Sequence, residues 1–318
     1  MEVDQVIVTP AADNNNASDL IRRFHDDCDL RGMVSTMEYI YRVKEYCTFL
    51  ESRGKTPLNV GREDLKAFLS QLKARELKFG TIKRVYTCVS AFCEFLIAEE
   101  LVEYNPILPF RKYYLHRYKN GSDSESRKLI EVEDASRLVN SILDSRDKCI
   151  IVLLFKTGMR VGELTSLDVG DVDLDKGEVT LKLKKKRSNR VLYLDDESIA
   201  VLQRWLVARK NRKGGEDHAL FLSKIGSRIK KRSVEEVIEK HAARLGLHNP
   251  GSEKLEDRFT PHCCRHWFVT HLLRAGMSRD FVKELRGDTR GEAIDIYNHI
   301  DKKELRESYL AHIPQLGI

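Results

Sequence analysis

Apolar residues recur at intervals of three and four along most of the chain, a pattern that predicts a mainly helical protein. The pattern is continuous over residues 18–98, where Ser35 is placed to cap one helix and further helices begin after Gly61 and near Thr81. Aromatic residues fall on the apolar faces of these helices, so we expect them to form the core of a helical bundle.

The second half of the chain combines helices with one segment of a different period. Residues 179–183 and 191–194 alternate between apolar and polar side chains and flank a polar turn, which predicts a β-hairpin. Helical patterns cover residues 132–143, 148–156, 198–209, 233–245, 262–275, 279–285 and 291–300. The expected fold is therefore mainly α, with a small hairpin or three-stranded sheet in an α+β second domain.

Proline and glycine mark the boundary between the two halves. Asn105-Pro106 and Pro109 interrupt the helical pattern, and Gly121-Ser122-Asp123-Ser124 has the composition of a flexible linker. We expect a disordered tail over residues 1–16, a helical domain over 17–110, a linker over 111–128 and a second domain over 129–318.

Charge is distributed unevenly between the two halves of the chain. The chain has 318 residues and a net charge of +6, enough length for two domains that each bury a core. Residues 1–110 hold 14 Lys and Arg against 17 Asp and Glu, whereas residues 111–318 hold 41 against 32. A basic second domain suits a polyanionic partner or a solvated basic surface. Neither a membrane span nor a secretory signal is evident, and irregularly spaced cysteines favour reduced thiols in the cytoplasm.

Arg160 is the first candidate for chemistry. It follows Gly158, which is placed to end the helix over residues 148–156, and precedes a short helix, so its planar guanidinium can face a phosphate. Glu163, three residues further on, can support it. A surface Arg–Glu pair is the alternative interpretation.

The turn of the predicted hairpin is strongly basic. Its cations are Lys182, Lys184, Lys185, Lys186, Arg187 and Arg190. Such a turn can contact DNA phosphates, and one crowded ammonium can protonate a leaving oxygen. A solvated turn remains the alternative.

Two further segments complete the set of candidates. His262 and Arg265 share a face at the start of a helix, and Tyr297 lies in a late helical pattern. A zinc site is disfavoured because Cys263 and Cys264 are adjacent and no second cysteine pair exists. Taken alone, Tyr297 would be assigned to a packed core.

One stretch of the acidic first domain is basic as well. Its cations are Lys73, Arg75, Lys78, Lys83 and Arg84. They can face a DNA backbone or form a solvated helix end.

In this order, the segments resemble the tyrosine recombinase (phage integrase) family over residues 18–312. Thr157-Gly158-Met159-Arg160-Val161-Gly162-Glu163-Leu164 is similar to the first arginine motif, and the run around His262 and Arg265 to the His-x-x-Arg box. Lys185 best matches the hairpin lysine, although Lys184 and Lys186 also fit. Ile296-Tyr297 fits the nucleophile motif, and the first domain resembles the core-binding, SAM-like domain.

One position departs from the family pattern. Arg286-Gly287-Asp288 stands where the family usually has Gly-His or a tryptophan, nine residues before the tyrosine. An ionised Asp288 cannot donate a hydrogen bond to phosphate. This form is similar to an archaeal branch of the family, and we expect Asp288 to orient Arg265, Arg290 or the Tyr297 hydroxyl.

The resemblance implies a site-specific DNA recombinase that needs no cofactor. Tyr297 would attack a phosphodiester and form a 3′-phosphotyrosine, Arg160 and Arg265 would bind the phosphate, Lys185 would protonate the leaving oxygen and His262 would assist. It also implies double-stranded DNA as partner, a cytoplasmic, nucleoid-associated location and a tetramer on two DNA sites. The apolar tail over residues 305–318 would dock on a neighbour or pack in cis. The rival functions are a type IB-like DNA-relaxing topoisomerase and a non-cutting DNA-binding relative.

Overall fold

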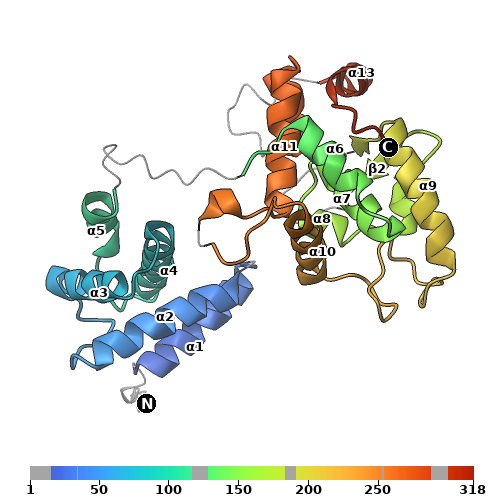
Figure 1. The fold of residues 1–318 in the computed structure, drawn as a ribbon. Helices are drawn as coiled ribbons and strands as arrows, with labels where there is room; N and C mark the ends of the chain where they lie inside the picture. The colour runs from blue at the N-terminus through green and yellow to red at the C-terminus, as the bar shows by residue number, and fades with distance from the viewer. Residues whose placement is uncertain (1–15, 34, 117–127, 183–190, 253, 288–299) are drawn as a thin grey trace, which may run out of the picture. The chain divides into compact units, whose positions relative to one another are not determined.

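The chain divides into two compact units, Met1–Ser122 and Asp123–Ile318. The structure, a computed structural model, describes residues 16–33, 35–116, 128–182, 191–252, 254–287 and 300–318 (Figure 1). The predicted mainly α fold with a small sheet is confirmed, and each unit is described by itself below. None of the helices in these ranges combines the length and apolar character that crossing a membrane requires.

The first unit is a helical bundle. Its helices are α1 (Ala17–Leu30), α2 (Thr36–Glu51), α3 (Arg62–Ala74), α4 (Phe79–Ala98) and α5 (Ile107–Tyr114). The aromatic residues do form its core, with the rings of Phe24 and Phe92 in one cluster and those of Tyr46 and Phe68 in another. Ser35 occupies the N-cap of α2, but its side chain makes no capping hydrogen bond, so that detail of the prediction is wrong.

Helix α5 extends into residues 111–114, which the sequence had placed in the linker. Pro109 lies in the first turn of α5, where a backbone N–H has no helical partner and its loss costs nothing. The Phe110 ring stacks on Tyr86 of α4, with 5.3 Å between ring centroids. Burial of that ring holds α5 against the bundle in spite of its prolines.

Helix α7 (Ser145–Thr157) lies at the centre of the second unit, and all of its apolar side chains are buried. It packs between α9 (Asp196–Lys210) and α11 (Pro261–Arg274) (Figure 1). The other helices are α6 (Val132–Asn140), α8 (Val161–Leu164), η1 (Val169–Asp171), α10 (Lys231–Arg244), η2 (Leu255–Asp257), α12 (Arg279–Arg286) and α13 (Lys302–His312). The helix predicted over residues 291–300 lies outside the described residues except for Ile300.

A three-stranded antiparallel sheet carries the predicted hairpin. Its strands are β1 (Val172–Asp173), β2 (Glu178–Thr180) and β3 (Val191–Tyr193), in the order β1-β2-β3. Val179 pairs with Leu192, and both are buried against the helices. The basic turn over residues 183–190 lies outside the described residues.

The C-terminal tail packs in cis. Leu305, Tyr309, Ile313 and Leu316 are buried in the core of the second unit. Leu310, another apolar residue of this predicted tail, is 41% exposed. The sequence left open whether the tail docks on a neighbour or packs in cis. In the single chain it packs in cis, against the core of its own second unit.

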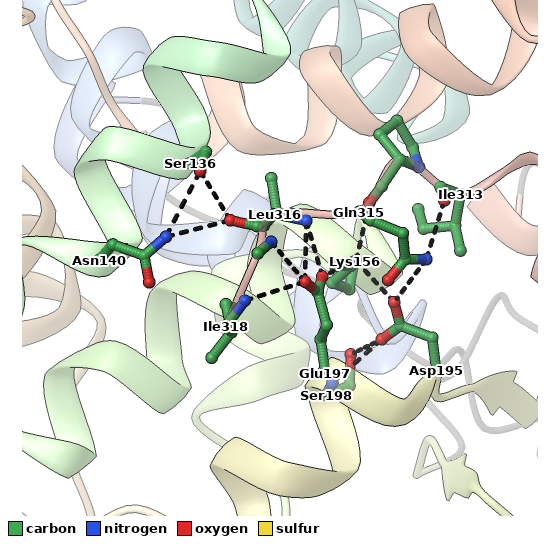
Figure 2. A network of polar contacts seen from close by, with 12 residues as sticks. Ser136, Asn140, Lys156, Asp195, Glu197, Ser198, Ile313, Gln315, Leu316 and Ile318 are labelled. Carbon is green, nitrogen blue, oxygen red and sulfur yellow. Dashed lines mark hydrogen bonds and ion pairs between the residues drawn. The ribbon is translucent and has the colours of Figure 1, made fainter.

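A buried polar network fixes the end of this tail (Figure 2). The fully buried Lys156 ammonium lies 2.5 Å from carboxylate oxygens of both Asp195 and Glu197, and donates to the Pro314 carbonyl at 2.7 Å. The Glu197 carboxylate also accepts the backbone N–H groups of Leu316 at 2.8 Å and of Ile318 at 3.0 Å. The last residues are thus held through their backbone N–H groups as well as through the buried side chain of Leu316.

Candidate active site

Arg160 is positioned by the end of α7 and the start of α8. Gly158 ends α7 in the left-handed conformation, with φ of 58°. A side chain there would also overlap the ring of Phe268 on α11, so only glycine fits both the backbone and the space. Two residues later, Arg160 forms the N-cap of α8.

Glu163 holds Arg160 at two points. Its carboxylate accepts the Arg160 backbone N–H at 2.7 Å and lies 3.3 Å from the guanidinium Nη1. The Glu163 side chain is buried, whereas the Arg160 side chain is 30% exposed. The predicted pair of Arg160 and Glu163 therefore fixes the backbone of Arg160 and leaves part of its guanidinium accessible.

Arg265 lies on the first turns of α11 and is buried. Thr260 forms the N-cap of this helix, and Pro261 occupies its first position, where proline is favoured. The Arg265 guanidinium donates through Nη1 to the Gly158 carbonyl at 2.6 Å and through Nη2 to the Arg286 carbonyl at 2.8 Å. A buried charge of this kind is tolerated because backbone oxygens satisfy it.

The two arginines converge on one oxygen atom. Nη1 of Arg160 also approaches the Arg286 carbonyl, at 3.5 Å, so this oxygen lies between two guanidinium groups that are 105 positions apart in the chain. Gly287, with φ of 61°, ends α12 there. An acceptor shared by two cations is the arrangement that a phosphate oxygen requires.

His262 lies one turn before Arg265 and is exposed. It lines a surface pocket of about 330 Å³ together with Val161 of α8 and Glu235 and Glu239 of α10. Because Val161 directly follows Arg160, the pocket places the exposed His262 side chain near the start of α8.

Several predicted site residues lie outside the described residues. They are Lys184, Lys185, Lys186, Arg187, Arg190, Asp288 and Tyr297. Along the chain, Asp288 is two residues from Arg286, whose carbonyl both arginines approach. The structure thus brings together Arg160, Glu163, His262 and Arg265, and it neither supports nor opposes the other assignments.

The basic stretch of the first unit is partly neutralised by acidic neighbours. Arg75 pairs with Glu45, and Arg84 forms a two-point contact with Glu38, in which Nη2 and Oε2 are 2.5 Å apart. Lys73, Lys78 and Lys83 are exposed. Counting cations in the sequence therefore overstated the positive charge that this surface presents.

The cysteines beside His262 are structural. Cys263 and Cys264 are buried, and burial raises the pKa of the Cys264 thiol well above its ordinary value. Within the described ranges, no three His, Cys, Asp or Glu residues are grouped in a way that could hold a metal ion. The Cys263 thiol instead donates to the Arg258 carbonyl at 3.4 Å.

Sequence reasoning missed the acceptors of the arginines. The carbonyls of Gly158 and Arg286 carry no signal in a sequence, because every residue has one. Gly158 was recognised from the sequence only as the end of a helix, and not as the residue whose carbonyl accepts a hydrogen bond from Arg265.

Two family models match the chain. The N-terminal SAM-like domain of phage integrases matches residues 31–100, and the phage integrase family model matches residues 125–304. The chain belongs to the phage integrase, or tyrosine recombinase, family.

Relatives of this recombinase carry the same family name. It is 31% identical to the tyrosine recombinase XerC of Herpetosiphon aurantiacus over 281 residues, covering 85% of this chain and 86% of that protein. It is 28% identical to XerC of Bacillus subtilis, over 88% and 90% of the two chains. These relatives are bacterial, and they do not support the archaeal-type branch suggested by Arg286-Gly287-Asp288.

Solved structures agree with the fold of the recombinase. The Tn1549 transposon integrase, solved in complex with transposon right end DNA, superposes with a TM-score of 0.68 at 19% identity, covering 91% of this chain and 97% of that chain. The XerH site-specific recombinase bound to its difH substrate gives a TM-score of 0.63 at 20% identity, over 92% and 84% of the two chains.

Proposed function

We propose that this recombinase cuts and rejoins double-stranded DNA at a specific site through a 3′-phosphotyrosine intermediate. The observation that carries the proposal is the convergence of Arg160 and Arg265 on one acceptor oxygen, the Arg286 carbonyl. Two guanidinium groups that share an acceptor can clamp the non-bridging oxygens of one phosphodiester. Membership of the tyrosine recombinase family supports site-specific recombination as the activity.

Each side chain has a distinct role in this reaction. Arg160 and Arg265 neutralise the charge that builds on the non-bridging oxygens. The Tyr297 oxygen bonds to phosphorus, the bond to the 5′ oxygen breaks, and Lys185 supplies the proton to that oxygen. His262 accepts the phenolic proton or hydrogen-bonds the phosphate. The phosphotyrosine conserves the energy of the broken bond, so rejoining needs no ATP.

We assign Asp288 a role in orienting its neighbours, Arg265 among them. The support is its place in the chain, two residues beyond the carbonyl that both arginines approach. Replacing Asp288 with alanine should slow adduct formation on nicked DNA. Cleavage by Asp288→Ala at the wild-type rate would remove this role.

Further DNA contacts come from the basic residues of both units. Lys73, Lys78 and Lys83 are exposed and suited to the phosphate backbone, as are Arg75 and Arg84 once they leave their carboxylates. The cations of the turn over residues 183–190 are proposed to serve the same purpose.

We propose a tetramer on two DNA sites as the active assembly. The tail over residues 305–318 is the candidate for exchange between protomers, because its end is held through backbone groups that an identical neighbour also offers. In the single chain the same contacts are made in cis, so exchange would replace them one for one. The cytoplasmic nucleoid is the proposed place of action.

The first experiment locates the DNA site. Tyr297→Phe protein, which binds but cannot attack, would be cross-linked to genomic DNA of the source organism and the bound fragments sequenced. A single chromosomal site indicates resolution of chromosome dimers, whereas several sites in host genes indicate integration of a mobile element. The archaeal-type branch stays a hypothesis that rests on Arg286-Gly287-Asp288 alone.

The second experiment tests the chemistry on that site. A nicked duplex that loses a short fragment after cleavage should trap a covalent protein–DNA adduct, and mass spectrometry should place the DNA on Tyr297 through its 3′ phosphate. Tyr297→Phe should form none, while Tyr113→Phe, the same change at an exposed tyrosine of the first unit, should form it normally. Absence of an adduct with wild-type protein would favour a non-cutting relative, and relaxation of supercoils without site preference would favour a topoisomerase.

A further inference from the structure

A second polar cluster lies beyond the arginine pair, at the opposite end of α8. We call it the Asp168 junction, and it consists of Asp168, Lys182 and Arg228. The Asp168 carboxylate contacts the Lys182 ammonium through one oxygen and the Arg228 guanidinium through the other. Arg228 also donates to the carbonyl oxygens of Thr165 at 3.1 Å and Leu167 at 2.8 Å, the residues that follow α8.

The junction joins three segments that are far apart in the chain. Asp168 follows the helix that starts at Arg160, and Lys182 follows β2. Arg228 comes from the segment before α10, whose backbone is tied to the same place by a hydrogen bond from the Leu220 N–H to the Leu167 carbonyl at 2.9 Å. The Asp168 carboxylate therefore links the segment that follows β2 to the segment that follows α8, the helix capped by Arg160.

Lys182 is the last described residue before the turn over residues 183–190. All three candidates for the proton-donating lysine, Lys184 to Lys186, follow it directly in the chain. Lys182 itself contacts Asp168 and lies 3.8 Å from Asp171, so its charge is already engaged by carboxylates. Its contribution is to anchor the strand from which the basic turn extends.

The junction is better suited to placement than to stability. The side chains of Asp168, Lys182 and Arg228 are 23%, 39% and 34% exposed, and ion pairs of this kind contribute at most about 1 kcal/mol to folding. Geometry is far more sensitive, because a misplacement of about 1 Å in a catalytic site can cost about 100-fold in rate. Losing the junction should therefore affect the reaction more than the fold.

We propose that Asp168 and Arg228 are positioning residues for the lysine that protonates the leaving oxygen. This inference rests on the proposed function, in which the Tyr297 oxygen bonds to phosphorus, and it takes His262 in the first of its two proposed roles, as acceptor of the phenolic proton. As the bond from phosphorus to the 5′ oxygen breaks, that oxygen takes a proton from the Lys185 ammonium. Asp168 and Arg228 act through Lys182, which follows β2 and precedes the basic turn.

The test compares two leaving groups. Both substrates are nicked duplexes of the genomic site recovered with Tyr297→Phe, and one carries sulfur in place of the 5′ bridging oxygen at the cleaved phosphate. A thiol is far more acidic than an alcohol, so a thiolate departs without a proton. A defect in proton donation disappears on the sulfur substrate, whereas a defect in phosphate binding or folding remains.

Asp168→Asn should slow adduct formation on ordinary DNA by about 10- to 100-fold, the range expected for a misplaced general acid. On the sulfur substrate it should react at the wild-type rate. Arg228→Gln should behave in the same way, and Arg160→Ala should be slow on both substrates. Thermal unfolding of each variant is measured alongside, and Arg228→Lys replaces any variant that unfolds at the assay temperature.

Asp173→Asn is the matched control. Asp173 is an aspartate of β1 whose side chain is 41% exposed, and it pairs with a lysine, Lys176, at 2.9 Å in the turn between β1 and β2. It should cleave both substrates at wild-type rates. Wild-type rates for Asp168→Asn on ordinary DNA, or equal slowing of a folded variant on both substrates, would overturn the inference. Wild-type protein that formed no adduct on either substrate would refute the proposed function itself.

Discussion

The buried cations of the second unit and two exposed arginines of the first unit are held in different ways. In the second unit, Lys156 and Arg265 are buried. The Lys156 ammonium contacts the Asp195 and Glu197 carboxylates and the Pro314 carbonyl, and Arg265 donates to the Gly158 and Arg286 carbonyls. In the first unit, Arg75 and Arg84 are exposed and end on the carboxylates of Glu45 and Glu38. These buried cations are thus fixed in position, whereas the exposed arginines can exchange one partner for another.

The difference follows from solvent. A buried cation has lost its water and must keep every protein partner, so its position is determined by the fold. An exposed ion pair is nearly balanced against hydration, so a phosphate can replace the carboxylate at little cost. Fixed arginines suit chemistry on one phosphate, and exchangeable arginines suit binding along many phosphates.

The largest effect should come from the buried lysine. Lys156→Met leaves the Asp195 and Glu197 carboxylates without their cation, and breaking such a buried pair costs about 3–5 kcal/mol of unfolding free energy. Urea denaturation of the variant measures this loss. Adding Glu197→Gln to Lys156→Met should recover part of it, and a loss similar to that of an exposed pair would contradict the comparison.

Arg265→Lys should have the next largest effect, on the reaction. A lysine keeps the charge but has one nitrogen in place of the two separate nitrogens that reach the Gly158 and Arg286 carbonyls, so adduct formation should fall by about 100- to 1,000-fold. Single-turnover cleavage of the nicked site measures this rate. The matched change Arg84→Lys in the first unit should leave the rate unchanged, and equal effects at both positions would erase the distinction.

Acid should weaken the contacts that hold the buried tail. Burial favours the neutral form of Glu197, but the hydrogen bonds from Lys156 and from the Leu316 and Ile318 N–H groups outweigh it, so the pKa of Glu197 lies below its ordinary value of 4.5. A lowered pKa in the folded state means that the stabilisation is complete above 4.5 and is lost as the pH falls through the folded value.

Hydrogen exchange at the Leu316 and Ile318 amides, followed from pH 7 downward, tests this dependence. Protection should hold to about pH 4.5 and decline below it. Glu197→Gln should lower protection at neutral pH and remove the dependence. Protection that is unchanged through this range would show that the apolar contacts of the tail are sufficient to hold it.

The smallest effect should come from the exposed pair. Arg84→Ala should leave the unfolding free energy almost unchanged, because an exposed ion pair contributes little to folding. If Arg84 contacts a phosphate, the slope of log affinity against log salt should become shallower by about 0.9. Glu38→Gln, which frees Arg84, should increase affinity for DNA, and no change in either variant would remove this surface from the DNA interface.

Local features of the chain were predictable because short segments encode them. The spacing of apolar residues gave the helices of both units, and the left-handed Gly158 ended α7 as expected. Alternation gave the hairpin of β2 and β3. The prediction failed at Pro109, which was expected to interrupt the helical pattern. Pro109 lies in the first turn of α5, where proline is tolerated, and the packing of Phe110 on Tyr86 holds that helix in place.

The chemical identity of the site was also carried by the sequence, because residue type and order are sufficient to name an arginine, a histidine and a tyrosine. Tertiary structure alone decided which oxygen Arg160 and Arg265 share, that Glu38 and Glu45 neutralise part of the basic surface, and that the tail packs in cis. The reason is that backbone carbonyls are the same at every position and long-range pairs leave no periodic pattern. Such contacts exist only once folding brings distant segments together.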